Sequence, residues 1–491
     1  MASMSQPTPK IYRWADNLSG VLVLFLVVFA PWALGTSERW SISTLNIGGY
    51  LLGGLLAVKW LVRRATGFKP ARWRIGAGGR WPLITLAVTS GCILLYVLTS
   101  GLNARMILDY TFMPKIPAAT GLSVTDLEPV EWLPQSYDGP RTLSAFWKYL
   151  AMAVSFWAAR DWLLGMTPNE RGAEDESSQG FPTARVALFL WVLVVSTAAL
   201  SLVGILQRLD GTDKLLWLFD SPNRSIMNFG PFPYRGHASE YLNLVWPVAL
   251  GFWWAKRDRF VRMRGVAARA GGGSHVLLLP LAAVIAMGPF LTASRGGVLI
   301  DLGLISCSFL VLFFAQRSGK RVRIGLAVAV AIVVFIGWEL GGATLGKRFK
   351  NASDDRLGGR EQVYEVGDRM EKDFRIWGSG AETFARLYFL YRESPEQIWD
   401  AYAHDDYLET RVTFGLVGFA LILASLILVP LATQFCPGIP VSRHFLILLI
   451  IGMGGMLLHA RFDFPFQSHS LLFVFLMLCA LMSSLSSPKR E

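Results

Sequence analysis

Long apolar segments alternate with short polar ones along most of the chain. Twelve segments are apolar over enough residues, about twenty, to cross the roughly 30 Å of hydrocarbon in a bilayer. They are residues 17–34, 43–62, 81–99, 142–160, 186–206, 239–255, 276–292, 297–315, 324–340, 412–432, 445–459 and 470–486. Because only closed helices satisfy backbone polar groups in lipid at this length, the pattern predicts an all-α polytopic transmembrane bundle of about 12 spans.

One long polar stretch, residues 341–411, interrupts this alternation. A polar loop of this size must lie outside the bilayer. Within it, Val363, Val366 and Met370 recur at helical spacing and predict one helix, and Ala381–Tyr391 predicts a second, aromatic-rich helix. Both are expected to lie on the membrane surface.

The stretch divides the chain into three expected parts. Residues 1–340 carry spans 1–9, residues 341–411 form a large periplasmic loop domain, and residues 412–491 carry spans 10–12. The overall mix of 53% hydrophobic and 17% charged residues excludes a soluble domain, which would expose too much apolar surface. The four cysteines lie in or beside spans and do not predict a disulfide framework.

The positive charge of the chain sets its orientation. The formal net charge is +12, and the basic residues cluster in alternate short loops at residues 63–80, 256–269 and 317–323. Basic loops of membrane proteins stay in the cytoplasm, so both termini are predicted to be cytoplasmic and the polar stretch to face outward. Because topology accounts for the charge, no nucleic-acid partner is expected.

The turn Thr292–Gly297 is the first candidate for chemistry. Two glycines permit a tight reversal between two spans, and Ser294 precedes Arg295 within it. A guanidinium fixed at this depth can bind a diphosphate in bidentate fashion. The alternative is an arginine that reaches the interface from a routine turn.

A second candidate segment precedes the sixth span. Arg235 and His237 lie here among aromatic residues, with Arg208 and Arg224 upstream in the same loop. Together with Arg295, these residues would form a cationic pocket at lipid depth, suited to a lipid diphosphate. The alternative is an aromatic belt with scattered solvated cations.

His404 lies where the chain returns to the membrane, and a structural role is the alternative to a catalytic one. A metal site built from His404, Asp405, Asp406 and Glu409 is not expected, because consecutive helix positions do not face one ion.

The last outer turn holds Arg461 and Asp463, either as an ion pair or with Arg461 as a further phosphate contact. Asp301 lies inside a span, where a carboxylate is usually paired or functional.

At this point the chain resembles the O-antigen ligase and polymerase superfamily of bacterial envelope glycosyltransferases. The resemblance runs from about residue 186 to 470. It rests on Ser294-Arg295-Gly296 between two spans, on His404-Asp405-Asp406-Tyr407-Leu408 at the end of the large outer loop, on Gly415-Leu416-Val417-Gly418 in the next span, and on Arg235-Gly236-His237-Ala238.

The resemblance implies a GT-C-like transferase of the bacterial inner membrane with its active site on the periplasmic face. It would move a glycan from undecaprenyl diphosphate to an acceptor hydroxyl, without metal, nucleotide sugar or other cofactor. His404 matches the proposed base, Arg295 matches a diphosphate-binding arginine, and Arg235 is chosen as the second arginine, with Arg208 and Arg224 as alternatives. Tyr407 and His237 are expected in supporting roles, as are Ser294 and Asp405.

One departure concerns the residue after the histidine. Many relatives carry Asn there, whereas this chain has Asp405, and a carboxylate close to the ring would favour the protonated imidazole.

Three functions remain open at this stage. Ligation of O-antigen to lipid A–core is preferred, and a polymerase of the same superfamily is the alternative. A transporter of lipid-linked oligosaccharide is the rival from another class, but it predicts charged residues at midplane cavities, whereas these spans are nearly free of charge.

Overall fold

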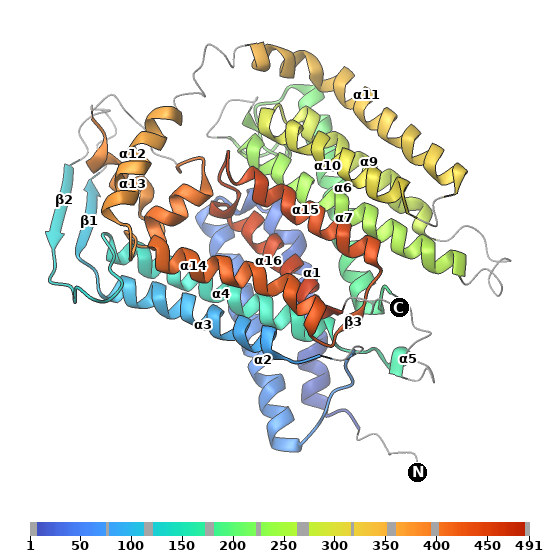
Figure 1. The fold of residues 1–491 in the computed structure, drawn as a ribbon, viewed down its shortest axis with the longest axis horizontal. Coiled ribbons are helices and arrows are strands. Elements are labelled where there is room, and N and C mark those ends of the chain that lie inside the picture. The colour runs from blue at the N-terminus through green and yellow to red at the C-terminus, as the bar shows by residue number, and fades with distance from the viewer. Residues whose placement is uncertain are drawn as a thin grey trace.

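The computed structural model describes residues 7–74, 78–111, 121–171, 181–221, 227–262, 274–315, 319–350, 360–393 and 402–486. Within these residues the protein is a helical bundle with few strands (Figure 1). Its larger helices are α1 (Lys10–Trp32), α2 (Arg39–Thr66), α3 (Trp81–Leu102), α4 (Gly139–Leu163), α6 (Ala184–Asp210), α7 (Arg235–Arg262), α9 (Leu278–Leu291), α10 (Arg295–Phe313), α11 (Lys320–Lys350), α14 (Asp406–Phe435), α15 (Arg443–His459) and α16 (His469–Ser484).

Every apolar segment predicted from the sequence overlaps one of these helices. Seven of them, within the described residues, are long and apolar enough to cross a membrane: α1, α2, α3, α6, α10, α11 and α14. Helices α15 and α16, and α9 with the turn before it, are apolar but shorter, and α4 and α7 are long but are not among the seven. A mostly helical bundle with several helices able to cross a membrane is therefore confirmed, and the number of about twelve crossings stays a prediction.

Short elements complete the described chain. They are η1 (Leu34–Thr36), α5 (Pro168–Arg171), η4 (Ser274–Leu277), η6 (Pro465–Gln467) and the parallel two-residue strands β3 (Ile439–Pro440) and β4 (Leu485–Ser486).

Two of the longer loops between the helices fold together at one end of the bundle. We call this part the cap: α12 (Arg360–Asp373) and α13 (Phe384–Tyr391) from the polar stretch, and the antiparallel strands β1 (Met106–Thr111) and β2 (Gly121–Asp126) (Figure 1). The two helices confirm the periodicity of the sequence, whereas the strands were not predicted. The cap also has a buried core of its own, in which Leu108 packs with residues of α12, α13 and the first turns of α14.

Polar contacts fasten the two loops of the cap to each other. The Tyr137 amide donates to the Ser379 carbonyl at 2.8 Å, and Arg386 donates to both Leu108 O and Asp138 Oδ2 at 2.9 Å. The described part of the polar stretch is thus a packed structure rather than a solvated loop.

Helix α14 joins the cap to the bundle. Its backbone breaks at Gly415, where φ is +59°. A side chain there would collide with the carbonyl of Ile376, since an added Cβ would lie 2.2 Å from that oxygen. The first turns of α14 therefore belong to the cap, and the remainder forms the apolar part of the helix.

The boundary expected at residue 340 is not a helix end. Helix α11 continues to Lys350, and its last turn carries Lys347, Arg348 and Lys350. Cations are favourable at the carboxyl end of a helix, where the dipole is negative, so the basic residues extend the helix instead of ending it.

Candidate active site

His404 lies immediately before α14 and pairs with a carboxylate far along the chain. Its Nδ1 atom is 2.9 Å from Oδ1 of Asp463, which lies in the turn between α15 and η6. Both side chains are mostly buried. The pair fixes the imidazole orientation, because a neutral ring that donates from Nδ1 has its basic nitrogen at Nε2.

Two tyrosines hold this pair in place. The hydroxyl of Tyr234 donates to Asp463, 3.2 Å from Oδ1 and 3.0 Å from Oδ2, and the hydroxyl of Tyr364 on α12 donates to the His404 carbonyl at 3.1 Å. Burial would raise the pKa of Asp463, but the hydrogen bond and charge of His404 outweigh it and hold that pKa below its usual value. The carboxylate is therefore ionised at neutral pH.

Asp405 does not act on the imidazole as its position in the sequence suggested. Its Oδ1 caps α14 by accepting from the amides of Tyr407 and Leu408, and its Oδ2 contacts Arg461. As the residue that precedes the first turn of α14, Asp405 directs its carboxylate toward the free backbone amides of that turn. Of the two roles considered for Arg461, the ion pair with Asp463 is not formed, because Arg461 pairs with Asp405 and Asp463 pairs with His404, and the phosphate contact stays a prediction.

The two other acidic residues of this segment bind backbone donors. Asp406 accepts from the Phe466 amide at 2.8 Å and from Gln467 at 3.2 Å, and Glu409 accepts from the Ala403 amide at 2.8 Å. These bonds join the start of α14 to η6 and to the residues before His404. The acidic run thus positions His404.

The amino ends of α7, α10 and α14 meet around the turn that carries Asp463. An added Cβ on Gly236 of α7 would lie 2.7 Å from Asp463 Oδ2, and one on Gly296 of α10 would lie 2.9 Å from Nε2 of His459. Helix amino ends carry partial positive charge and unpaired amides, so three of them at one place favour an anion.

Two of the predicted arginines stand at these helix ends. Arg235, the first residue of α7, makes no hydrogen bond or ion pair to any other residue that the structure describes. Arg295, the first residue of α10, donates to the carbonyl of Arg348 at 3.2 Å. Burial, and then the nearby charges of Arg348, Arg208 and Arg295, lower the pKa of Arg235 to about 10. Among the residues that the structure describes, no carboxylate pairs with Arg235 or Arg295, so these two guanidinium groups are suited to an anion.

Arg208 binds backbone carbonyls of the protein itself. Its guanidinium donates to the carbonyls of Leu291 and Asn228 at 2.9 Å and to that of Thr292 at 3.5 Å. These bonds clamp the turn that leads into Arg295. The other alternative, Arg224, lies outside the described residues.

Arg348 was missed by the sequence reasoning, because it lies in the last turn of an apolar helix and in no recognisable motif. Its charge lowers the pKa of Arg235 more than any other neighbouring charge does, and its carbonyl accepts from Arg295. Asp463 was recognised only as a partner for Arg461, and Tyr234 only as an aromatic residue.

The supporting residues each have a definite place. Ser294 caps α10 by accepting from the Gly297 amide at 3.2 Å, and Tyr407 donates to the Leu457 carbonyl at 2.8 Å. His237 packs edge-on against Tyr234 and Phe464, with ring centres 4.9 and 4.8 Å apart. All three order the elements around His404.

The backbone is strained in the two segments that carry His404 and Arg295. His404 and Ala293, which stands two residues before Arg295, have φ of +54° and +59°. Residues other than glycine rarely adopt this region, and functional sites are where such conformations concentrate.

Three buried groups are close enough to be considered as metal ligands. Among the described residues, Glu240, His459 and Asp463 each offer one atom within 4.8 Å of the others. Asp463, however, already accepts from His404, Tyr234 and the Phe464 amide. One histidine and one glutamate are too few ligands for a stable site, so the group does not fit a metal ion.

Comparison with known proteins finds a family match in the part of the chain that carries Arg295 and His404. Residues 277–423 match the family model Wzy_C, described as O-antigen ligase. No curated protein matches the chain. Arg235 and Asp463 lie outside the matched residues but contact the same site. The match covers the motifs at Ser294, His404 and Gly415 and supports the resemblance to the O-antigen ligase and polymerase superfamily over residues 277–423, whereas the motif at Arg235 lies outside it.

Proposed function

We propose that this membrane enzyme transfers a glycan from undecaprenyl diphosphate to an acceptor hydroxyl at the periplasmic face of the bacterial inner membrane. The preferred acceptor is lipid A–core, which makes the reaction O-antigen ligation. The observation that carries the proposal is the His404–Asp463 pair packed against the amino end of α7, which begins at Arg235, with the amino end of α10, which begins at Arg295, against the neighbouring His459. A positioned base and unmatched cations are what such a transfer needs.

In the proposed reaction, His404 is the general base. Asp463 holds the Nδ1 proton, so Nε2 takes the proton of the acceptor hydroxyl as its oxygen bonds to the anomeric carbon. The bond from that carbon to the diphosphate oxygen breaks, and the diphosphate leaves with the electron pair. Arg235 and Arg295 stabilise the charge that develops on it, and the single displacement inverts the anomeric centre. No step requires a metal ion.

A polymerase of the same superfamily would use the same chemistry on a different acceptor. Purified protein supplied with lipid-linked glycan and lipid A–core separates the two. Core-attached product supports the ligase, lengthened carrier-linked chains support the polymerase, and transport into liposomes without transfer would support the rival transporter. A folded His404→Ala protein with full activity would refute the role of the base.

A further inference from the structure

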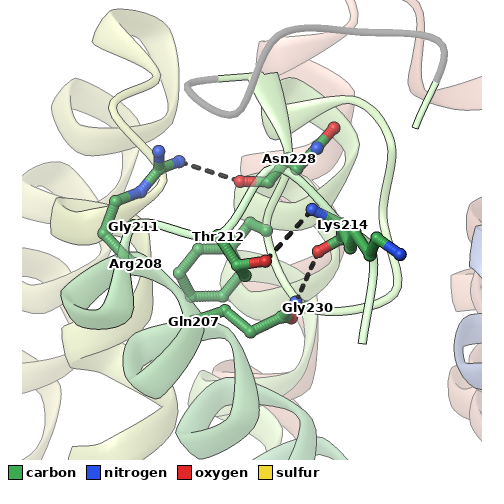
Figure 2. A pocket seen from close by; sticks show the side chains of 8 residues that line it. Gln207, Arg208, Gly211, Thr212, Lys214, Asn228 and Gly230 are labelled. Atoms are coloured by element: carbon green, nitrogen blue, oxygen red, sulfur yellow. Dashed lines mark hydrogen bonds between the residues drawn. The ribbon is translucent and has the colours of Figure 1, made fainter. Parts of the chain in front are cut away.

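A small pocket lies at the carboxyl end of α6, beside Arg208. Figure 2 shows it enclosed by the last turn of that helix and by the loop that follows. Its lining residues are Gln207, Arg208, Gly211, Thr212, Lys214, Asn228, Phe229 and Gly230. The free volume is about 40 Å³. Since one water needs about 10–15 Å³ by this measure, the pocket admits a small substituent and not a whole sugar ring.

Gln207 gives the pocket its chemical character. The side chain is buried, and its Nε2 donates to the Lys214 carbonyl at 2.9 Å (Figure 2). This bond fixes the amide so that Oε1 remains as the acceptor, and Oε1 is buried with no hydrogen-bond partner among the described residues. A buried acceptor without a partner is costly, so the occupant of the pocket must be a donor.

This requirement selects among the parts of a lipid-linked glycan. Phosphate oxygens only accept hydrogen bonds, and a prenyl chain offers neither donor nor acceptor, so both would leave Oε1 unpaired. A sugar hydroxyl is a donor of the right size. Thr212, which accepts from the Lys214 amide at 3.2 Å, offers a second hydroxyl in the lining.

The pocket also lies beside the arginines. Arg208 forms part of its wall, and its guanidinium donates to the carbonyls of Leu291 and Thr292 in the turn that leads into Arg295. A diphosphate held by Arg235 and Arg295 would therefore bring the sugar attached to it close to this wall. We infer that the pocket binds one hydroxyl-bearing substituent of the donor's diphosphate-linked sugar, with Gln207 Oε1 as acceptor, an inference that rests on the proposed function for the identity of the donor.

Binding, measured without acceptor, tests this inference independently of transfer. The probes are short polyprenyl diphosphate monosaccharides in which one hydroxyl at a time is replaced by hydrogen. The wild-type protein should bind one of these deoxy donors about 2- to 10-fold more weakly than the parent, the range expected for one hydrogen bond. Equal binding of all donors would overturn the inference, even if the protein transfers glycan.

Two substitutions at the same position separate recognition from structure. Gln207→Met and Gln207→Glu both lose the bond to the Lys214 carbonyl, but only the methionine lacks an oxygen acceptor. Gln207→Met should bind parent and deoxy donor equally, whereas Gln207→Glu should keep the preference. If both variants lose affinity for every donor to the same degree, the pocket is structural. Should Gln207→Met not fold, the wild-type comparison and Gln207→Glu still decide, because a glutamate that loses the preference also overturns the inference.

A matched control is available elsewhere in the chain. Gln135 is similarly buried and also donates to a backbone carbonyl, that of Glu131, at 3.2 Å. It does not line the pocket. Gln135→Met should leave the preference among donors unchanged, and a change there would show that the preference responds to stability alone.

Discussion

Nδ1 of His404 lies 2.9 Å from Oδ1 of Asp463, although 59 residues separate the two in the chain. The pair joins the end of the cap to the turn after α15, so it forms only when both have folded. It also decides which nitrogen of the imidazole is basic. Replacing Asp463 by Asn should therefore lower kcat by about 10²–10⁴-fold, because the ring loses its orientation and its tautomer.

Asp405 supplies the control for that variant. It is next to His404 in the chain but caps α14 instead of binding the ring. Asn is an equally good cap, so Asp405→Asn should retain most of the activity. Turnover of the two variants, compared after both are shown to be folded, decides which carboxylate serves the histidine. A larger loss with Asp405→Asn would contradict the assignment.

The stability of the protein should depend on Asp463 in acid. Its pKa in the folded protein is held below its usual value, near 3.9, by His404. The ionised carboxylate thus stabilises the fold fully above about pH 4, and this contribution is lost as the pH falls through the lower, folded pKa. Thermal unfolding of the wild-type protein and Asp463→Asn should differ most above pH 4 and converge below it. A difference that does not change with pH would count against the pair.

Tyr234→Phe tests the support of the carboxylate. The hydroxyl donates to Asp463, so its removal should cost about 1 kcal/mol of stability and lower kcat by roughly 3- to 10-fold. Tyr391 is the matched control, since its hydroxyl donates to Asp373 at 2.8 Å within the cap. Tyr391→Phe should leave kcat unchanged. Equal effects of the two variants on turnover would show that Tyr234 acts on the fold alone.

The arginines should divide into two groups. Lysine keeps the charge but loses the bidentate geometry. Arg235→Lys and Arg295→Lys should therefore lower kcat/KM for the donor by about 10- to 100-fold, as expected for a charge-assisted bond, with little effect on stability. Arg208→Lys should mainly lower the unfolding temperature, because its guanidinium clamps three carbonyls. Donor titrations and thermal unfolding on the same preparations distinguish the groups, and a purely thermal defect in Arg235→Lys would remove that residue from the site.

The sequence predicts much of this structure because lipid imposes simple rules. Apolar length identified every one of the large helices, and helical spacing identified α12 and α13. The motifs also pointed to His404 and Arg295, and in the structure each stands at a helix start that its own neighbours define. The β1–β2 hairpin escaped prediction because its strands are held by the cap rather than by an alternating pattern.

The pairing of charged residues was the other feature that the sequence did not predict. Sequence proximity suggested Asp405 as a possible neighbour of the imidazole and Asp463 as one of two possible partners of Arg461, and the structure forms neither pair. Helix capping decides the first, and the packing of α15 against α7 and α10 decides the second, and neither leaves a local signal. Arg348 reaches the site only because α11 is longer than its apolar segment.

The substitution Gly296→Ala tests whether the amino end of α10 must lie close to the His459 side chain. An added Cβ would lie 2.9 Å from His459 Nε2, so Gly296→Ala should overpack the contact and cost about 1–3 kcal/mol. Because the shift falls beside Arg295, affinity for the donor should fall as well. Gly303, on the same helix, has nothing within 4 Å of an added Cβ, and Gly303→Ala should be neutral or stabilising by up to about 1 kcal/mol. Donor binding and thermal unfolding of the two variants check the argument, and a Gly296→Ala protein that matches Gly303→Ala in both would show that α10 can withdraw from the turn without disturbing the site.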